Sequence, residues 1–154
     1  PNNRRARLMA TPFLDYLLVR RQITHPSGQA LIRKCLEALL IELGGNDGLR
    51  GLPLAATRTN LQAVIDRTRA KYPQVRIVIA GMKMPDNLGE SYTRQFEGLY
   101  RDLAETNRVA LIPFLLDGVG GRPELNLPDQ IHPNAEGHRR VATNVWQVLQ
   151  PILQ

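Results

Sequence analysis

Two short polar segments carry residue types that can do chemistry. The first is Gly44-Gly45-Asn46-Asp47-Gly48, which directly follows an apolar run. Glycines permit a tight turn that exposes backbone amides, and the side-chain NH2 of an asparagine in such a turn can donate a hydrogen bond to a developing oxyanion. The same residue types also build ordinary turns. Alone, this segment leaves both interpretations open.

The second segment is Asp129-Gln130-Ile131-His132-Pro133-Asn134. Only two residues separate Asp129 from His132, so the carboxylate can hold one imidazole nitrogen while the other nitrogen acts as a base. The alternative is structural, because Pro133 and Asn134 are also typical of a helix start. Other candidates are weaker. The chain has only two serines, of which Ser91 is expected to cap a helix, and Trp146 is expected in the core.

The elements that must position these segments alternate from residue 39 onward. Short apolar runs predict buried strands, spaced apolar residues predict amphipathic helices, and a stretch rich in Gly, Pro and Asp predicts a long loop. The predicted strands are 39–43, 76–80 and 109–114, the helices include 61–70, 92–103 and 141–149, and the loop is 118–133. This order predicts an α/β fold, a three-layer α/β/α sandwich around a parallel sheet. Ligands bind such sheets at the carboxyl ends of the strands, where both polar segments fall.

Together the two segments resemble conserved blocks of the SGNH (GDSL-type) hydrolase superfamily. Gly44, Asn46 and Asp47 match its Gly-x-Asn-Asp block, and Asp129, His132 and Pro133 match its Asp-x-x-His-Pro block. Longer strings around both blocks resemble the bacterial arylesterase and multifunctional thioesterase I–lysophospholipase L1 branch. The resemblance covers about residues 39–153.

The resemblance implies a flavodoxin-like fold and an ester hydrolase (a carboxylesterase or arylesterase, extending to a thioesterase or lysophospholipase) with a Ser-His-Asp triad. His132 would be the general base and acid, and Asp129 would orient it. Asn46 would donate to the oxyanion, with Gly44 shaping that part of the oxyanion hole. The substrate would be a small-molecule ester or thioester, and neither a cofactor nor a metal is implied.

The nucleophile block of the family, Gly-Asp-Ser-Leu, is not found ahead of residue 39. Ser27 is a weak candidate, because it lies too near Gly44 for the family's spacing. Gln130 stands where the family more usually has glycine. Either the chain is a natural variant or fragment without the nucleophile, or its start is misread, since the segment 9–13 can be encoded so that another frame reads Gly-Asp-Ser-Leu. The alternative function is a non-catalytic acyl- or ligand-binding module on the same scaffold.

Length and charge predict one domain, 1–154, with an atypical basic segment at 1–38 and a family-like region at 39–154. Residues 1–40 hold seven Arg or Lys against two Asp or Glu, so they carry most of the formal net charge of +6. Stacking aromatics and a recognition motif do not accompany these arginines, which argues against a nucleic-acid partner. The single cysteine, Cys35, is expected in the core.

The sequence contains no run near the roughly 20 apolar residues of a membrane span and no recognisable signal peptide. The compartment stays open, because relatives of this branch are often periplasmic or secreted. If the family's first strand is absent, the open sheet edge favours a homodimer.

Overall fold

The computed structural model describes residues 38–153 of the 154-residue chain. Ser27, Cys35 and the basic start therefore lie outside the described residues. The elements, in chain order, are β1 (Ala38–Ile41), α3 (Gly45–Leu49), α4 (Leu54–Lys71), β2 (Arg76–Ala80), the 3-10 turn η2 (Asp86–Leu88), α5 (Glu90–Asn107), β3 (Ala110–Ile112), the 3-10 turn η3 (Pro123–Leu125) and α6 (Ala135–Leu153).

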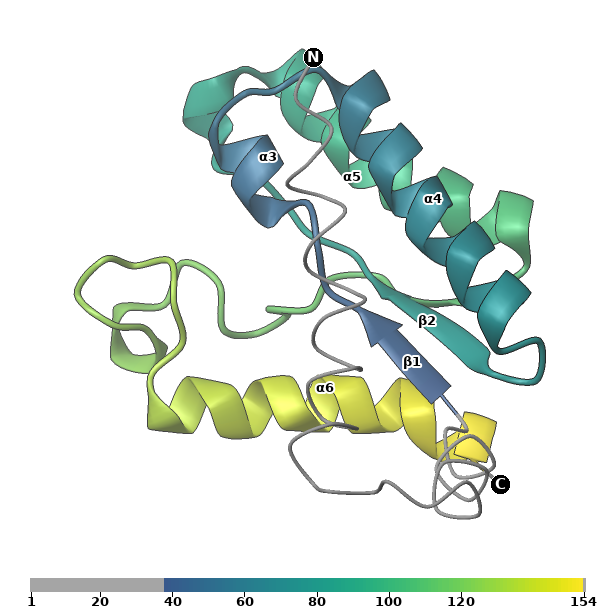
Figure 1. Ribbon diagram of the computed structural model, residues 1–154. Helices are drawn as coiled ribbons and strands as arrows, with labels where there is room; N and C mark the ends of the chain where they lie inside the picture. Colours follow the sequence, from purple (N-terminus) through teal and green to yellow (C-terminus); the bar gives the residue numbers. More distant parts are fainter. Residues whose placement is uncertain (1–37, 154) are drawn as a thin grey trace, which may run out of the picture.

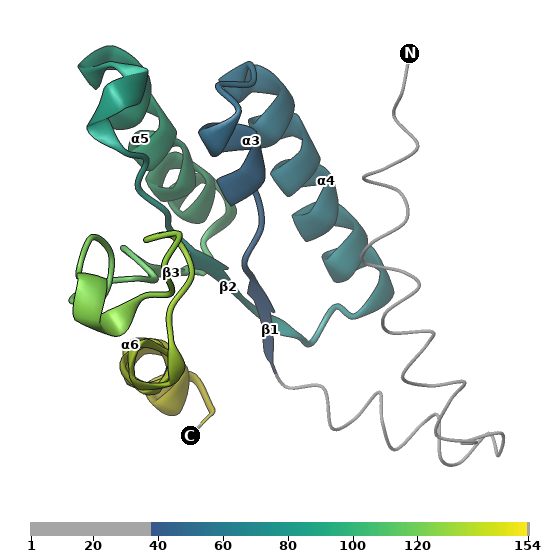
Figure 2. The same ribbon diagram turned by 90° about the vertical axis from the view of Figure 1, so that its left-hand side faces the viewer.

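The three strands form a parallel sheet in the order β1-β2-β3 (Figures 1 and 2). Val78 of the central strand is in register with Leu40 of β1 and with Ala110 of β3. The run Arg76–Ala80 forms this strand because a parallel strand covered on both faces is apolar and rich in β-branched residues. The predicted strands are confirmed, and β1 and β3 are shorter than their apolar runs.

Helices cover both faces of the sheet. Helices α4 and α5 lie on one face and α6 lies on the other (Figure 2). Successive β2 side chains point to opposite faces, so Ile77 and Ile79 pack with α4 and α5 whereas Val78 and Ala80 pack with α6. The three-layer α/β/α sandwich is thereby confirmed. Within residues 38–153, no helix combines the length and apolarity that crossing a membrane requires.

Helix ends follow local chemistry. Helix α4 ends at Lys71, immediately before Tyr72-Pro73, because a residue that precedes proline disfavours the helical region. Helix α5 begins after Gly89, whose φ of 85° is a conformation that glycine adopts readily.

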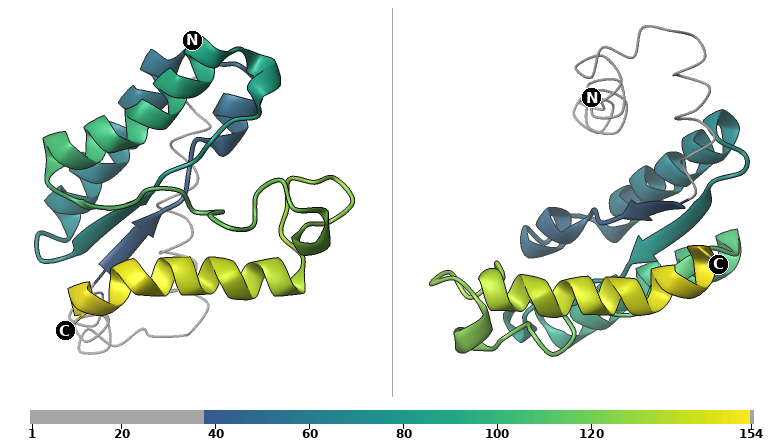
Figure 3. Two further views of the ribbon diagram at one scale, coloured as in Figure 1. Left: turned by 180° about the vertical axis from the view of Figure 1, so that it is seen from behind. Right: turned by 90° about the horizontal axis from the view of Figure 1, so that it is seen from below.

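The carboxyl end of the sheet carries both polar segments. Helix α3 directly follows β1, and the long loop between β3 and α6 leaves the same end of the sheet (Figures 1 and 3). Pairing continues past the strands there, because Gly81 N–H donates to the Ile112 carbonyl and Leu115 N–H donates to the Gly81 carbonyl.

Candidate active site

The first part of the site is a turn, Gly44–Leu52, called the Asn46 turn below. The sequence predicts a glycine turn here, and the chain instead winds into the single helical turn α3, capped by Gly44 at φ 99°. Backbone bonds close it, from Gly48 N–H to the Gly44 carbonyl (3.0 Å) and from Arg50 N–H to the Asn46 carbonyl (3.2 Å). Asn46 is exposed, and its side-chain amide has no hydrogen-bond partner within residues 38–153. A side-chain amide of this kind can donate two hydrogen bonds.

Three hydroxyl groups from the neighbouring helices hold the Asn46 turn. Tyr100 donates to the Leu43 carbonyl at the entry (3.0 Å), Thr57 donates to the Asp47 carboxylate in the middle (3.1 Å), and Tyr92 donates to the Leu52 carbonyl at the exit (2.9 Å). The apolar pattern assigns both tyrosines to a core-facing stripe and does not indicate these contacts. In the sequence, only the residue type could have indicated these contacts, because the hydroxyl group of a buried tyrosine usually finds a hydrogen-bond partner.

The glycines of the turn lie against side chains that leave no room for a β-carbon. A Cβ at Gly44 would lie 2.5 Å from the Tyr100 hydroxyl oxygen, and one at Gly45 would lie 2.8 Å from the Met82 sulfur. At Gly48 it would meet the Met84 sulfur at 2.4 Å and the Phe96 ring at 2.6 Å. The turn is thus seated on α5 and on the segment that follows β2.

The second part of the site is a narrow loop, Asn126–Pro133, called the His132 hairpin below. Asn126 and Pro133 form an isolated antiparallel bridge at its base. Leu127 N–H donates to the His132 carbonyl (2.7 Å), and Gln130 N–H donates back to the Leu127 carbonyl (2.9 Å). Gln130 has φ 57°, in the left-handed region that favours glycine. The family's preference for glycine at this position has its physical reason here.

Asp129 and His132 contact one another directly. The Asp129 carboxylate accepts hydrogen bonds from the backbone N–H groups of Ile131 (2.9 Å) and His132 (3.0 Å), and its other oxygen lies 2.7 Å from His132 Nδ1. The His132 and Ile131 backbone amides and the His132 ring lower the pKa of Asp129 to about 2, so it is ionised at neutral pH. A carboxylate at Nδ1 favours the tautomer with the proton on Nδ1. It leaves Nε2 as the base, on a side chain that is 70% exposed.

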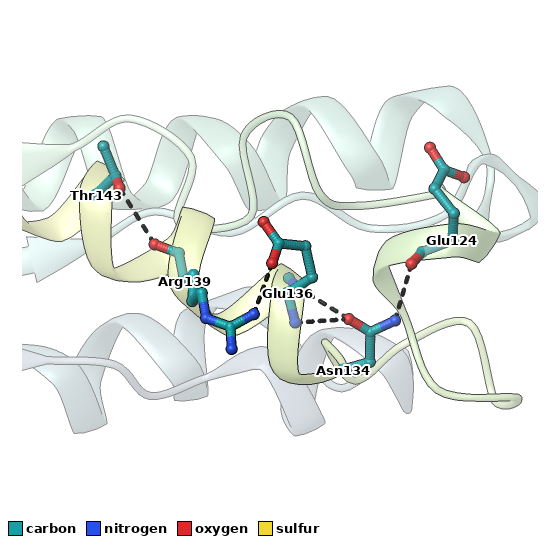
Figure 4. A network of polar contacts seen from close by, with 6 residues as sticks. Glu124, Asn134, Glu136, Arg139 and Thr143 are labelled. Atoms are coloured by element: carbon teal, nitrogen blue, oxygen red, sulfur yellow. Dashed lines mark hydrogen bonds and ion pairs between the residues drawn. The ribbon is translucent and has the colours of Figure 1, made fainter.

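Asn134 anchors the hairpin to the start of α6 (Figure 4). Its side-chain oxygen accepts from the N–H groups of Glu136 and Gly137 (3.0 Å each), which is an N-cap, and its side-chain NH2 donates to the Glu124 carbonyl (2.9 Å). The helix-start interpretation of this segment is therefore confirmed, and it coexists with the Asp129–His132 contact.

Asn126 anchors the other side of the hairpin base. It is 6% exposed, and its side-chain NH2 donates to the carbonyls of Val119 and Arg122 (2.7 Å each). A buried amide that closes a loop in this way fixes the position from which the hairpin projects. The sequence gives no signal for this role.

The candidate residues are thus only partly joined by direct contacts. Asp129 and His132 are hydrogen-bonded, while Asn46 lies at the same end of the sheet and makes no side-chain bond to either of them in the described chain. The capping prediction for Ser91 was wrong, because Gly89 occupies that position and the Ser91 hydroxyl accepts from Gln95 within α5 (2.9 Å). Residues 38–153 contain no group of three His, Cys, Asp or Glu side chains placed to hold a metal ion.

Comparison with known proteins gives consistent matches. Residues 8–140 match the model of the GDSL-like Lipase/Acylhydrolase family, so the match extends upstream of residue 39. The chain is 38% identical over 115 residues to esterase TesA of Pseudomonas aeruginosa, covering 75% of this chain and 56% of that protein. It is 32% identical to thioesterase 1/protease 1/lysophospholipase L1 of Escherichia coli K12, covering 75% of this chain and 54% of that one.

A solved structure agrees with the sequence matches. The crystal structure of TesA superposes with a TM-score of 0.71 at 30% identity, covering 91% of this chain and 86% of that one. The chain spans just over half the length of the curated relatives named above. With the strand order, the Asn46 turn and the Asp129–His132 pair in place, this chain belongs to the GDSL-like lipase/acylhydrolase family.

Proposed function

We propose that the described residues supply the acid–base and oxyanion-binding parts of an SGNH-type serine ester hydrolase. The observation that carries this proposal is the Asp129–His132 pair, bonded at 2.7 Å at the end of the sheet that also carries Asn46. An ionised carboxylate that holds Nδ1 leaves Nε2 to take and return a proton, which is the division of labour in a serine hydrolase triad.

In the proposed reaction, His132 Nε2 takes the proton from an attacking serine hydroxyl as that oxygen bonds to the ester carbonyl carbon. The carbonyl oxygen becomes an oxyanion, to which the exposed Asn46 amide donates a hydrogen bond. Collapse of this intermediate breaks the ester bond, and His132 returns the proton to the departing alcohol or thiol. Water then repeats the sequence on the acyl-enzyme, releasing the acid and the free serine.

The substrate class follows from the chemistry and from the relatives. The names esterase and thioesterase/lysophospholipase on the matched proteins indicate carboxylic esters and thioesters. Two exposed apolar residues, Leu127 and Ile131, lie in the His132 hairpin and are each 45% exposed. They offer an apolar surface for an acyl or aryl group beside the base.

The nucleophile is the open position in this proposal. Ser91 is the one serine within residues 38–153, and its hydroxyl is bonded to Gln95 rather than to His132. Ser27 lies outside the described residues. Without an activated serine, Asn46 and His132 can only position water, which retains a small part of the catalysis. We therefore expect the chain as written to hydrolyse short-chain aryl esters weakly or not at all.

A serine-directed fluorophosphonate probe tests the proposal on two proteins, the chain as written and a form with a complete upstream Gly-Asp-Ser segment. The second form should label stoichiometrically and hydrolyse aryl esters, and His132→Ala should abolish both. His138→Ala is the matched control, because His138 is an exposed histidine on α6. Absence of His132-dependent hydrolysis in the restored form would contradict the proposal.

Two further outcomes of this experiment would modify the proposed function. Labelling of the chain as written, lost in His132→Ala, would identify an unrecognised nucleophile, and peptide mapping would examine Ser27 first. Saturable binding of a fatty acid without hydrolysis in either form would instead favour the acyl-binding module. The nucleotide sequence over residues 9–13 tests the misread start separately, since a frame without Gly-Asp-Ser-Leu excludes it.

A further inference from the structure

Tyr100 is one of two almost fully buried residues that donate a hydroxyl hydrogen bond beside the Asn46 turn, the other being Thr57. The Tyr100 side chain is 1% exposed, and the ring packs edge-on against Phe96 with centroids 5.4 Å apart. The hydroxyl group donates to the carbonyl of Leu43, the residue immediately before Gly44. Burial and the nearby carboxylates of Asp47 and Glu42 raise the pKa of Tyr100, so the hydroxyl stays protonated and remains a donor.

The hydroxyl also fills the space above Gly44. A β-carbon on Gly44 would lie 2.5 Å from the Tyr100 oxygen and 3.6 Å from the ring carbon that bears it, so the oxygen makes the close contact. Gly44 adopts φ 99°, and it is the residue from which α3 and Asn46 start. The Tyr100 hydroxyl therefore hydrogen-bonds the Leu43 carbonyl and also occupies the space that a β-carbon on Gly44 would need.

A phenylalanine at position 100 would keep the apolar packing and lose only the hydroxyl contacts. The Leu43 carbonyl would lose a donor, and the peptide that aims α3 would be held by fewer groups. Thr57 and Tyr92 hold later points of the turn, Asp47 and Leu52. Thr57 also lies against Gly44 through its methyl carbon, 3.2 Å from the position of a Gly44 β-carbon, but of the three hydroxyl groups only that of Tyr100 hydrogen-bonds the backbone at the entry.

We infer that Tyr100 is a positioning residue for oxyanion stabilisation, because its hydroxyl fixes the Leu43–Gly44 peptide and thereby aims the Asn46 side chain. Tyr100 itself touches no reacting atom. The inference rests on the proposed function for its catalytic meaning, whereas the geometric claim concerns only the Asn46 turn. The proposed function and the geometric claim about the Asn46 turn can therefore be refuted independently.

The first test is Tyr100→Phe in the full chain, read by nuclear magnetic resonance. The Asn46 side-chain NH2 signals, identified by their loss in Asn46→Asp, should shift. Exchange of the Gly48 amide hydrogen should accelerate about 10-fold, the usual net worth of one hydrogen bond. Tyr72→Phe is the control, since the Tyr72 hydroxyl has no hydrogen-bond partner within residues 38–153. Unchanged Asn46 signals with a lowered melting temperature would overturn the inference in favour of a purely structural role.

The second test is a double-mutant cycle between positions 44 and 100. Gly44→Ala should lower the melting temperature less in the Tyr100→Phe background than in the wild type, because the 2.5 Å contact is absent there. The same alanine at Gly51, which also has positive φ but open space around it, should show no such dependence on Tyr100. Equal losses for Gly44→Ala in both backgrounds would contradict the contact.

The third test uses the form with the complete upstream segment. Tyr100→Phe should lower kcat about 10-fold with little change in KM, because a misaimed donor weakens only transition-state binding. If no form shows His132-dependent hydrolysis, the proposed function fails and the resonance and coupling data still decide the geometric claim. A change in KM alone would overturn the oxyanion role of Tyr100.

Discussion

The Asn46 turn is held by side chains that lie between 10 and 57 residues away along the chain, whereas the His132 hairpin is held by bonds among residues 119–137. The turn packs against helices α4 and α5. The side chains that hydrogen-bond it come from these helices, and the sequence of the turn itself does not indicate them. The tip of the hairpin is exposed, and hydrogen bonds between its own residues hold its conformation. One half of the site thus depends on tertiary packing and the other half on local sequence, so substitutions should perturb them separately.

The largest expected effect on stability comes from Gly137, where helix α6 packs against the residues that flank the His132 hairpin. A β-carbon at the buried Gly137 would lie 2.1 Å from the Leu125 carbonyl oxygen, a backbone atom that cannot swing away. Gly137→Ala should therefore lower the free energy of unfolding by about 3 kcal/mol, measured by urea denaturation. The Asp129–His132 contact should loosen while the Asn46 signals stay in place. Gly98→Ala, in open space on α5, should instead stabilise by about 1 kcal/mol.

The converse substitution addresses the turn. Gly48→Ala would place a β-carbon 2.6 Å from the Phe96 ring and 2.4 Å from the flexible Met84 side chain, and the ring cannot yield. A loss of about 2 kcal/mol is expected, with the Asn46 signals shifted and the His132 ring signals unchanged. Gly45→Ala is the matched control, because its β-carbon would meet only the flexible Met82 side chain and the substitution should cost less. Movement of both sets of signals would break the separation between the two halves.

Loss of the α6 cap should be smaller. Asn134→Ala removes the acceptor for two backbone N–H groups and a donor to the Glu124 carbonyl, and should cost about 1 kcal/mol in thermal unfolding. Asn134→Asp keeps the acceptor and should recover most of that loss. An equal loss in both variants would show that the Glu124 contact, rather than the cap, holds the hairpin to the helix.

Gln130 offers a small gain. Its left-handed conformation costs an L-residue about 1–2 kcal/mol of strain, which glycine would avoid. Glycine in turn loses more chain entropy on folding, about 0.5–1 kcal/mol, which offsets part of the relief. Gln130→Gly should therefore stabilise the protein by about 0.5 kcal/mol, read as a raised melting temperature. Arg108→Gly, at φ 50° after α5, should give a similar gain away from the site. A destabilised Gln130→Gly would mean that the glutamine side chain itself supports the hairpin.

The smallest effect concerns pH and is confined to the hairpin. The pKa of Asp129 falls from its ordinary 3.8 to about 2, so its contribution to stability is fully present above pH 3.8 and is lost as the pH falls through 2. A carboxyl-carbon titration by nuclear magnetic resonance should report that low pKa. His132 ring signals should move in the same acid range, and Asp129→Asn should remove this step. A midpoint near 4 would mean that the Asp129 bonds do not persist in solution.

The same division explains what the sequence could predict. Tyr72-Pro73 ends α4 where the dipeptide indicates, and 76–80 forms β2 with the predicted bounds. The Asp129–His132 contact is equally local, since two intervening residues and a turn suffice to bring the side chains together. Periodicity and short spacings carry this information.

The sequence predictions are wrong where the local structure involves residues that are distant along the chain. Segment 44–51 is predicted as a turn, whereas its residues form the helical turn α3, which Tyr100 and Thr57 contact from distant positions in the sequence. The sequence predicts Trp146 in the core, yet it is 53% exposed, because α6 directs Val145, Val148 and Leu149 toward the sheet. Helix α4 starts at Leu54, ahead of the predicted range 61–70, and its first turns place Leu54 against the core and the buried polar residue Thr57 against Asp47. Residue type alone does not identify these partners.

The two thioethers beneath the Asn46 turn have a chemical consequence. Met82 and Met84 are only half-buried, and their sulfur atoms lie against Gly45 and Gly48 with no room for even a β-carbon. Peroxide adds an oxygen to such sulfurs and makes them polar, so oxidation should displace α3 while the Asp129–His132 pair stays intact. Mass spectrometry of peroxide-treated protein, with leucine at both positions as the resistant reference, would show whether oxidative damage reaches this site through its methionines.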